Sequence, residues 1–237
     1  MFAHNSDPKE LILGMKHLIG KDGFVLIENA YAVDTMLHGE FDQIYHEHMF
    51  YYSALSMLNL LKQYDLHLFD ILFSDVHGGS IVFIASSTEY AFTNTLSKQI
   101  EYEKDLFNQN KIFNIFLSKI EAVKDFVKER ISIGLAENKI IASYGAPAKA
   151  FTMFSLLNLN QNTIKFCIDT TPFKIGKRFP VSNIPIISEE DLINHDYDIL
   201  LVNAWNYKDD IIKKADKIFK PGTELIFPLP KPQSIII

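Results

Sequence analysis

The spacing of apolar residues divides the chain into three stretches with different periodicity. In the first stretch, apolar residues recur at helical spacing over 11–19, after polar cap candidates and a proline at 5–8, which predicts a helix. A glycine-containing turn and the apolar run 24–27 come next, and helix, turn and strand together predict one half-unit of a doubly wound sheet. The same pattern then predicts a helix over 53–64 and strands over 66–73 and 81–86.

The second stretch, residues 90–136, contains no proline and only one glycine, Gly134. Its apolar residues keep helical spacing throughout, which predicts one long helix or two consecutive helices. Residues 134–139 form the clearest candidate for a linker, because a glycine there interrupts the helical pattern.

The third stretch, about the last hundred residues, alternates between short apolar runs and helical patterns. Strands that alternate with helices predict a parallel α/β sheet. The predicted strands cover 139–144, 164–168, 197–202 and 224–227, and the predicted helices cover 150–157, 189–194 and 207–219.

Composition narrows the class of protein. Of the 237 residues, 48% are hydrophobic, which excludes a disordered chain. The net charge is −6, so the chain has no general excess of positive charge that would attract nucleic acid. No apolar run reaches the roughly 18 residues that span a bilayer, and no signal peptide is evident, so we expect a cytoplasmic protein without a membrane partner. Cys167 lies in an apolar run and is expected to be a buried, inert thiol. The first residues have no cap or arm, so we expect the chain to begin inside a domain.

The densest cluster of titratable groups is Tyr45, His46, Glu47 and His48. Histidine is the side chain whose ordinary pKa suits a general base near neutral pH, and a neighbouring carboxylate can hold its tautomer. The alternative is a solvated loop with one structural histidine. A metal site at His46 and His48 lacks a third ligand that the sequence can place, so no metal is predicted.

Other candidates lie where predicted strands end. His77 and Gly78 stand between two strands, in a ligand-contacting loop or a plain hairpin turn. Tyr144, Gly145 and Lys149 lie between a strand and a helix, where open α/β sheets bind anions, although a plain turn is equally compatible. Asp169 follows the next strand. Its carboxylate could accept hydrogen bonds from sugar hydroxyls, or it could be a helix cap or turn residue. Trp205 follows a later strand, where its ring could stack on a base or sugar or could pack in the hydrophobic core.

Together these segments resemble the S-adenosylmethionine-dependent sugar C-methyltransferases, which act on nucleotide-linked keto-deoxysugars. The resemblance rests on residues 41–48 (FDQIYHEH) and 51–53 (YYS), then on 144–149 (YGAPAK), 169–176, 184–186 (IPI) and 204–206 (AWN), in the same order. Val181 and Ser182 stand where the family usually has a Pro-Gly-type turn. The N-terminal zinc segment and the glycine-rich cofactor loop of the family have no counterpart in this sequence.

The resemblance implies a fold and a mechanism. Residues 1–87 are expected to be the C-terminal half of a Rossmann-like methyltransferase domain, 88–138 a helical connector, and 139–237 a complete Rossmann-like parallel α/β domain that binds nucleotide sugar. His48 is implied as the base that removes the proton next to a ketone, with Tyr45, Glu47 and His4 as companions. The enolate carbon then takes the methyl group of S-adenosylmethionine, the implied cofactor.

Three functions are compatible with the sequence. The first is a methyltransferase whose missing half comes from elsewhere, such as a separate partner chain. In it, the expected substrate-binding residues are His46, His77, Gly78, Tyr144, Gly145, Lys149, Asp169 and Trp205. The second is a non-catalytic nucleotide-sugar-binding remnant. The third is a nucleotide-dependent oxidoreductase that uses the turn at Gly145, against which the absent dinucleotide-binding pattern counts.

Overall fold

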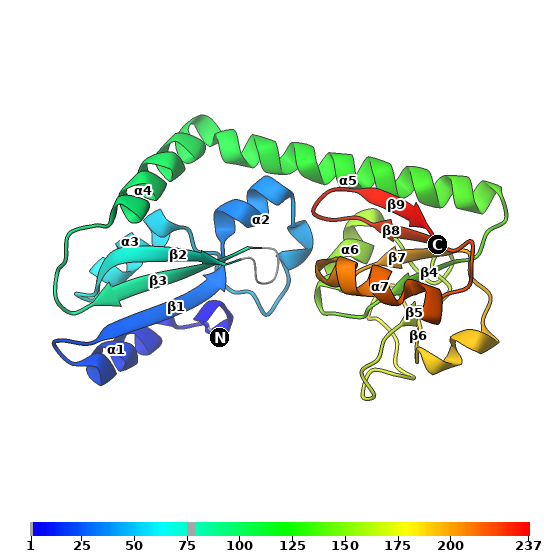
Figure 1. The fold of residues 1–237 in the computed structure, drawn as a ribbon, viewed down its shortest axis with the longest axis horizontal. Helices are drawn as coiled ribbons and strands as arrows, with labels where there is room; N and C mark the ends of the chain where they lie inside the picture. The colour runs from blue at the N-terminus through cyan, green and yellow to red at the C-terminus, as the bar shows by residue number, and fades with distance from the viewer. Residues whose placement is uncertain (1, 75–78) are drawn as a thin grey trace. The chain divides into compact units, whose positions relative to one another are not determined.

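The computed structural model describes residues 2–74 and 79–237 and forms two compact units. The first unit contains residues 1–37 and 46–116, and the second contains His38–Tyr45 and Leu117–Ile237 (Figure 1). The segment His38–Tyr45 therefore belongs to the second unit, although the residues before and after it in the sequence belong to the first. The predicted domain boundaries at residues 87 and 138 stay a prediction.

The first unit is built on a three-stranded antiparallel sheet in the order β1-β3-β2. Strand β3 lies between the other two, so β1 and β2 run parallel to each other. Both pairs of this sheet are antiparallel, because the short connection from β2 to β3 allows an antiparallel pair but not a parallel crossover. The expected half of a Rossmann-like methyltransferase domain stays a prediction. The strands of the sheet are β1 (Phe24–Ala30), β2 (His67–Ser74) and β3 (Ser80–Ser86).

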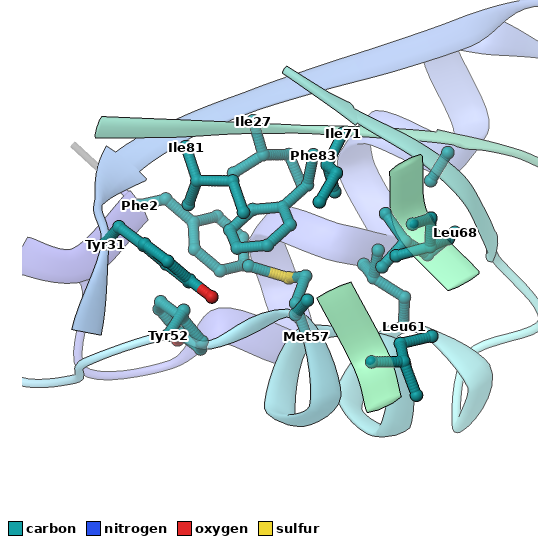
Figure 2. Close-up of a cluster of buried hydrophobic side chains, with 14 of the residues drawn as sticks. Phe2, Ile27, Tyr31, Tyr52, Met57, Leu61, Leu68, Ile71, Ile81 and Phe83 are labelled. Carbon is teal, nitrogen blue, oxygen red and sulfur yellow. The ribbon is translucent and has the colours of Figure 1, made fainter. Parts of the chain in front are cut away.

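Four helices accompany this sheet: α1 (Pro8–Ile19), α2 (Ala32–His38), α3 (Ala54–Lys62) and α4 (Asn94–Phe107). Helix α1 begins as predicted, with Asp7 accepting a hydrogen bond from the backbone amide of Lys9 and Pro8 in the first turn. The inner face of the sheet carries Ile27, Ile81 and Phe83, which are buried with Met57 and Leu61 of α3 (Figure 2). This cluster is the hydrophobic core of the unit.

The predicted long helical stretch is two helices, α4 and α5 (Lys111–Ala136), separated by a 3-10 turn at Asn108–Asn110. Gln109 and Asn110 have positive φ there, which ends α4. Gly134 does not open a linker, contrary to the sequence prediction. It lies inside α5, where an added Cβ would collide with Ile199 Cδ1, so the glycine permits close packing of helix on strand.

The second unit contains a six-stranded sheet in the order β6-β5-β4-β7-β8-β9. The pairs from β6 to β8 are parallel and only β9 is antiparallel, which confirms the predicted parallel α/β architecture. Helices α6 (Lys149–Leu157) and α7 (Lys208–Ile218) and the 3-10 helix η5 (Glu190–Asn194) connect strands, as predicted. The strands are β4 (Ile141–Tyr144), β5 (Cys167–Ile168), β6 (Ile186–Ile187), β7 (Ile199–Val202), β8 (Glu224–Phe227) and β9 (Gln233–Ile236).

A strained turn precedes β6. Val181 is 90% exposed and has φ +63°, a conformation that costs a β-branched residue roughly 1–2 kcal/mol. Val181→Gly should therefore raise the free energy of unfolding by about 0.5–1 kcal/mol, because relief of strain exceeds the added freedom of the unfolded chain. Urea unfolding should show a higher midpoint. Asn183→Gly is the matched control with a smaller gain, because asparagine tolerates the φ of +57° at that position. A midpoint that falls in Val181→Gly would contradict the argument.

Candidate active site

Two histidines that are distant in sequence meet in the first unit. The rings of His4 and His48 lie edge to face with centroids 4.9 Å apart and planes at 88°. Two neighbouring contacts hold this arrangement: the Met49 amide donates to the Ala3 carbonyl at 2.9 Å, and buried Phe2 packs against Tyr52 at 5.2 Å. The 3-10 helix η1 (Phe2–His4) thus delivers His4 to the residue that the sequence proposes as base.

The other members of the tyrosine–histidine cluster are placed differently. Glu47 Oε1 lies 3.9 Å from His46 Nε2, and both side chains are largely exposed, at 52% and 84%. An exposed pair of this kind attracts weakly. The His48 ring also meets Tyr51, with centroids 6.2 Å apart. Tyr45 is half-buried and belongs to the second unit.

The second unit has a cavity of about 590 Å³ at the carboxyl ends of β4, β5 and β7. Three of the predicted binding residues line it: Tyr144, Gly145 and Asp169. Ligands of open α/β sheets bind at this edge. The lining also includes Pro147, Ile168, Thr170, Thr171, Lys174, Glu189, Ala204, Tyr207, Asp210, Ile211, Lys214 and Ile218.

Gly145 and Asp169 shape this cavity through the backbone. Gly145 has φ +87°, and a Cβ there would lie 2.8 Å from the Cβ of Ala204, so only glycine fits the turn. Asp169 Oδ2 accepts from the Ala146 amide at 2.7 Å, and Oδ1 accepts from the Thr171 amide at 2.8 Å. These amides and Lys174 hold the pKa of Asp169 below its usual range, although burial opposes them. Asp169 therefore fixes two loops, which corresponds to the turn-forming alternative.

Charged and aromatic residues that the sequence analysis did not select complete the lining. Tyr144 donates to Glu189 at 2.8 Å, and burial together with this carboxylate raises the pKa of Tyr144 above its ordinary value. Lys174 and Lys214 supply cations. Lys214 could have been found from periodicity, since Ile211, Lys214 and Ile218 recur at helical spacing along one face of α7.

Lys149 and Trp205 do not line the cavity, in contrast to the expected anion site and ligand plate. Both belong to a separate cluster with Asp42, which is 1% exposed. The Trp205 Nε1–H donates to Asp42 Oδ2 at 2.6 Å, and Lys149 Nζ lies 3.7 Å from the same oxygen. The Lys149 ammonium also stands 3.8 Å from the centroid of the indole ring. Trp205 is thus a buried residue, as in the core-packing alternative.

Several expectations concern other parts of the chain. His77 and Gly78 lie outside the described residues. Cys167 is completely buried, as expected, and burial raises its pKa to about 12. Within residues 2–74 and 79–237, no three or more His, Cys, Asp or Glu side chains are grouped so that they could hold a metal ion. No helix in the described part of the chain has the length and apolar character needed to cross a membrane.

A comparison with known families shows which family the chain belongs to. Residues 75–230, more than half of the chain, match the model of the C-methyltransferase C-terminal domain. The chain belongs to this C-methyltransferase family. The matched residues include the parallel strands from β4 to β8.

A curated relative supports the same assignment. The C-methyltransferase NovU of Streptomyces niveus is 33% identical over 237 residues, which cover 99% of this chain. The chain spans 56% of the length of that relative. The family resemblance seen in the sequence is confirmed, and the coverage agrees with a C-terminal part.

Proposed function

We propose that this C-methyltransferase chain contributes the proton-abstracting site of an enzyme that methylates carbon next to the ketone of a nucleotide-linked keto-deoxysugar. The observation that carries the proposal is the contact between His4 and His48, whose ring centroids are 4.9 Å apart. Two imidazoles side by side supply a base and a hydrogen-bond donor to adjacent atoms of one substrate, which is what enolate formation requires.

In this proposal His48 takes the proton α to the carbonyl. His4 donates a hydrogen bond to the carbonyl oxygen as negative charge develops there, and Tyr45 donates a second one. Glu47 orients a histidine, and its carboxylate lies 3.9 Å from His46. The proton passes from carbon to the imidazole, and the electron pair of the C–H bond becomes the enolate, which is the nucleophile for the methyl group.

S-adenosylmethionine supplies an electrophilic methyl group when it is bound. Asp169 accepts from the Ala146 and Thr171 amides and so holds two backbone segments together. The chain spans 56% of the length of its curated relative, and we propose that a further segment or a separate partner chain binds the cofactor.

The outer face of the first sheet supports a further segment. Register places Leu26, Leu72, Val82 and Ile84 on that face, opposite the buried inner face. Leu26 and Leu72 are 62% and 52% exposed, and large bare apolar surfaces usually mark interfaces. We propose that the other half of the methyltransferase domain covers these residues.

The cavity of the second unit favours a role in holding the substrate. It combines Lys174 and Lys214 with Tyr144, Tyr207 and the turn at Gly145, groups that suit a diphosphate, a sugar or a base. The same cavity favours a second candidate function, in which the chain is a nucleotide-sugar-binding protein without catalysis.

Exchange of the acidic C–H of a nucleotide-linked keto-deoxysugar in D₂O separates the two candidates, because proton removal needs no methyl donor. With the full chain, we expect deuterium to enter the carbon next to the ketone faster than in buffer alone, as NMR of the sugar would show. The matched control is the same nucleotide sugar with its ketone reduced to an alcohol, which should not exchange. Saturable binding without accelerated exchange would overturn the catalytic proposal in favour of the binding protein.

A further inference from the structure

The cavity of the second unit has more acidic than basic side chains in its lining. The carboxylates are those of Asp169, Glu189 and Asp210, and the ammonium groups are those of Lys174 and Lys214. One of the two lysines is already paired, since Lys174 Nζ lies 3.4 Å from Asp169 Oδ2. Repulsion between like charges therefore disfavours a diphosphate among these groups. The lining favours a neutral group of the ligand instead.

The turn between β4 and α6, which lies beside the cavity, uses its amides within the protein. The Gly145 amide donates to the Ile168 carbonyl at 2.7 Å, and the Ala146 amide donates to Asp169 Oδ2 at 2.7 Å. The next residue, Pro147, has no N–H. A turn of this kind binds a phosphate through free amides, and these three residues offer none. Recognition of the ligand is therefore left to side chains of the lining.

Glu189 is placed to accept a hydrogen bond from a ligand. Its Oε2 accepts from the Tyr144 hydroxyl at 2.8 Å, and no other partner of this carboxylate is found within the described residues. The other two carboxylates of the lining are engaged differently. Both oxygens of Asp169 accept backbone amides, and Asp210 is exposed and lies 3.5 Å from Lys213 Nζ. Oε1 of Glu189 is thus available as an acceptor at the cavity.

The local structure gives the Glu189 carboxylate a fixed orientation. Glu189 occupies the N-cap position of η5, but its side chain makes no capping hydrogen bond there. It follows β6 by two residues, and Tyr144 ends β4, so the pair joins two strand ends at the carboxyl edge of the sheet. Burial and the Glu189 carboxylate raise the pKa of Tyr144, so the phenol keeps its proton and stays the donor.

We propose that Glu189, oriented by Tyr144, accepts a hydrogen bond from a ring hydroxyl of the ligand, so that the cavity holds a hydroxylated ring and not the diphosphate. A hydroxyl is a donor that a carboxylate accepts strongly, whereas an ionised diphosphate has no donor to offer. The volume of about 590 Å³ suits a ring of this kind. The ring is the pentose of the nucleoside or the linked hexose, which present the same chemistry. The inference rests on the proposed function for the class of ligand, a nucleotide-linked sugar.

Glu189→Gln in the full chain tests the proposal, because glutamine keeps the shape and removes the charge. UDP-glucose and dTDP-glucose are the probes, and calorimetric titration gives the dissociation constants. We expect Glu189→Gln to raise the dissociation constant about 10-fold, since a neutral amide replaces a charged acceptor. A diphosphate at the same place would give the opposite sign, because loss of a negative charge would tighten its binding. A lower dissociation constant in Glu189→Gln would therefore overturn the proposal.

Shortened probes identify the ring. UDP and dTDP lack the hexose, and 2′,3′-dideoxy-UDP also lacks the pentose hydroxyls. A loss of affinity seen with the sugar conjugates but not with UDP and dTDP assigns the contact to the hexose. A loss seen with UDP but not with its dideoxy form assigns the contact to the pentose. An equal loss with every probe, the dideoxy form included, would overturn the proposal, because no ring hydroxyl would then account for it.

The matched control is Glu190→Gln, which makes the same change at the next residue, an exposed position that is not part of the lining. It should leave the dissociation constants nearly unchanged. Equal effects of Glu189→Gln and Glu190→Gln would overturn the proposal, and so would the failure of every probe to bind. The titrations need neither proton removal nor a methyl donor. Absence of deuterium exchange would therefore count against the proposed chemistry alone, and the titrations would still decide the role of Glu189.

Discussion

His48→Asn should slow deuterium entry into the carbon next to the ketone of a nucleotide-linked keto-deoxysugar by about 10²–10⁴-fold, the range that a positioned general base contributes. Asparagine keeps the polarity and much of the shape of the imidazole but cannot accept a proton at neutral pH. The affinity for the nucleotide sugar should change little, because the base acts on the C–H bond only as that bond breaks. The exchange is followed by NMR of the sugar, and the affinity by calorimetric titration.

His46→Asn is the matched control, since it makes the same chemical change two residues earlier. The side chain of His46 is 84% exposed, and the ring contact with His4 is made by His48. We expect the His46 variant to retain most of the exchange rate. Equal losses in the two variants would show that the loop as a whole, and not one imidazole, governs exchange. Wild-type exchange in His48→Asn would assign the base elsewhere.

The elements that were predictable from the sequence are those whose pattern is local. The apolar spacing of α1 and of the strands β4, β7 and β8 reflects burial on one side or on both, and each segment carries that information itself. Strand pairing is different. The alternating burial of β1 is the same whether its neighbour is parallel or antiparallel, so the order β1-β3-β2 could not be predicted from it.

The candidate site shows the same division. His4 and His48 were singled out by the resemblance, and tertiary contacts such as the hydrogen bond between Met49 and Ala3 bring them together. Lys149 was expected to face an anion because it opens a helix after a strand. Its actual partner is Asp42, a carboxylate distant in sequence, and charges are buried only when such a partner exists. No pattern around Lys149 alone contains that information.

A second large effect concerns the core of the first unit, where Glu103 of α4 is completely buried. Its carboxylate accepts from the Ala54 and Leu55 amides at 2.8 Å and from the Tyr31 hydroxyl at 2.5 Å. These amides begin α3, and the next two are satisfied by the side chain and the carbonyl of Ser53. Glu103 thus completes the N-terminal cap of α3, where the helix dipole favours an anion.

Glu103→Ala should lower the free energy of unfolding of the first unit by about 3–5 kcal/mol, because three buried donors lose their acceptor and a cavity opens. Glu103→Gln should cost less, since one oxygen remains, but its amide group must then face a donor. The matched control is Glu101→Ala on the same helix, an exposed position where the change should stay within about 0.5 kcal/mol. Urea unfolding followed by circular dichroism gives the three values. A Glu103→Ala variant as stable as Glu101→Ala would mean that solvent reaches the start of α3, and that this cap does not hold α3 against α4.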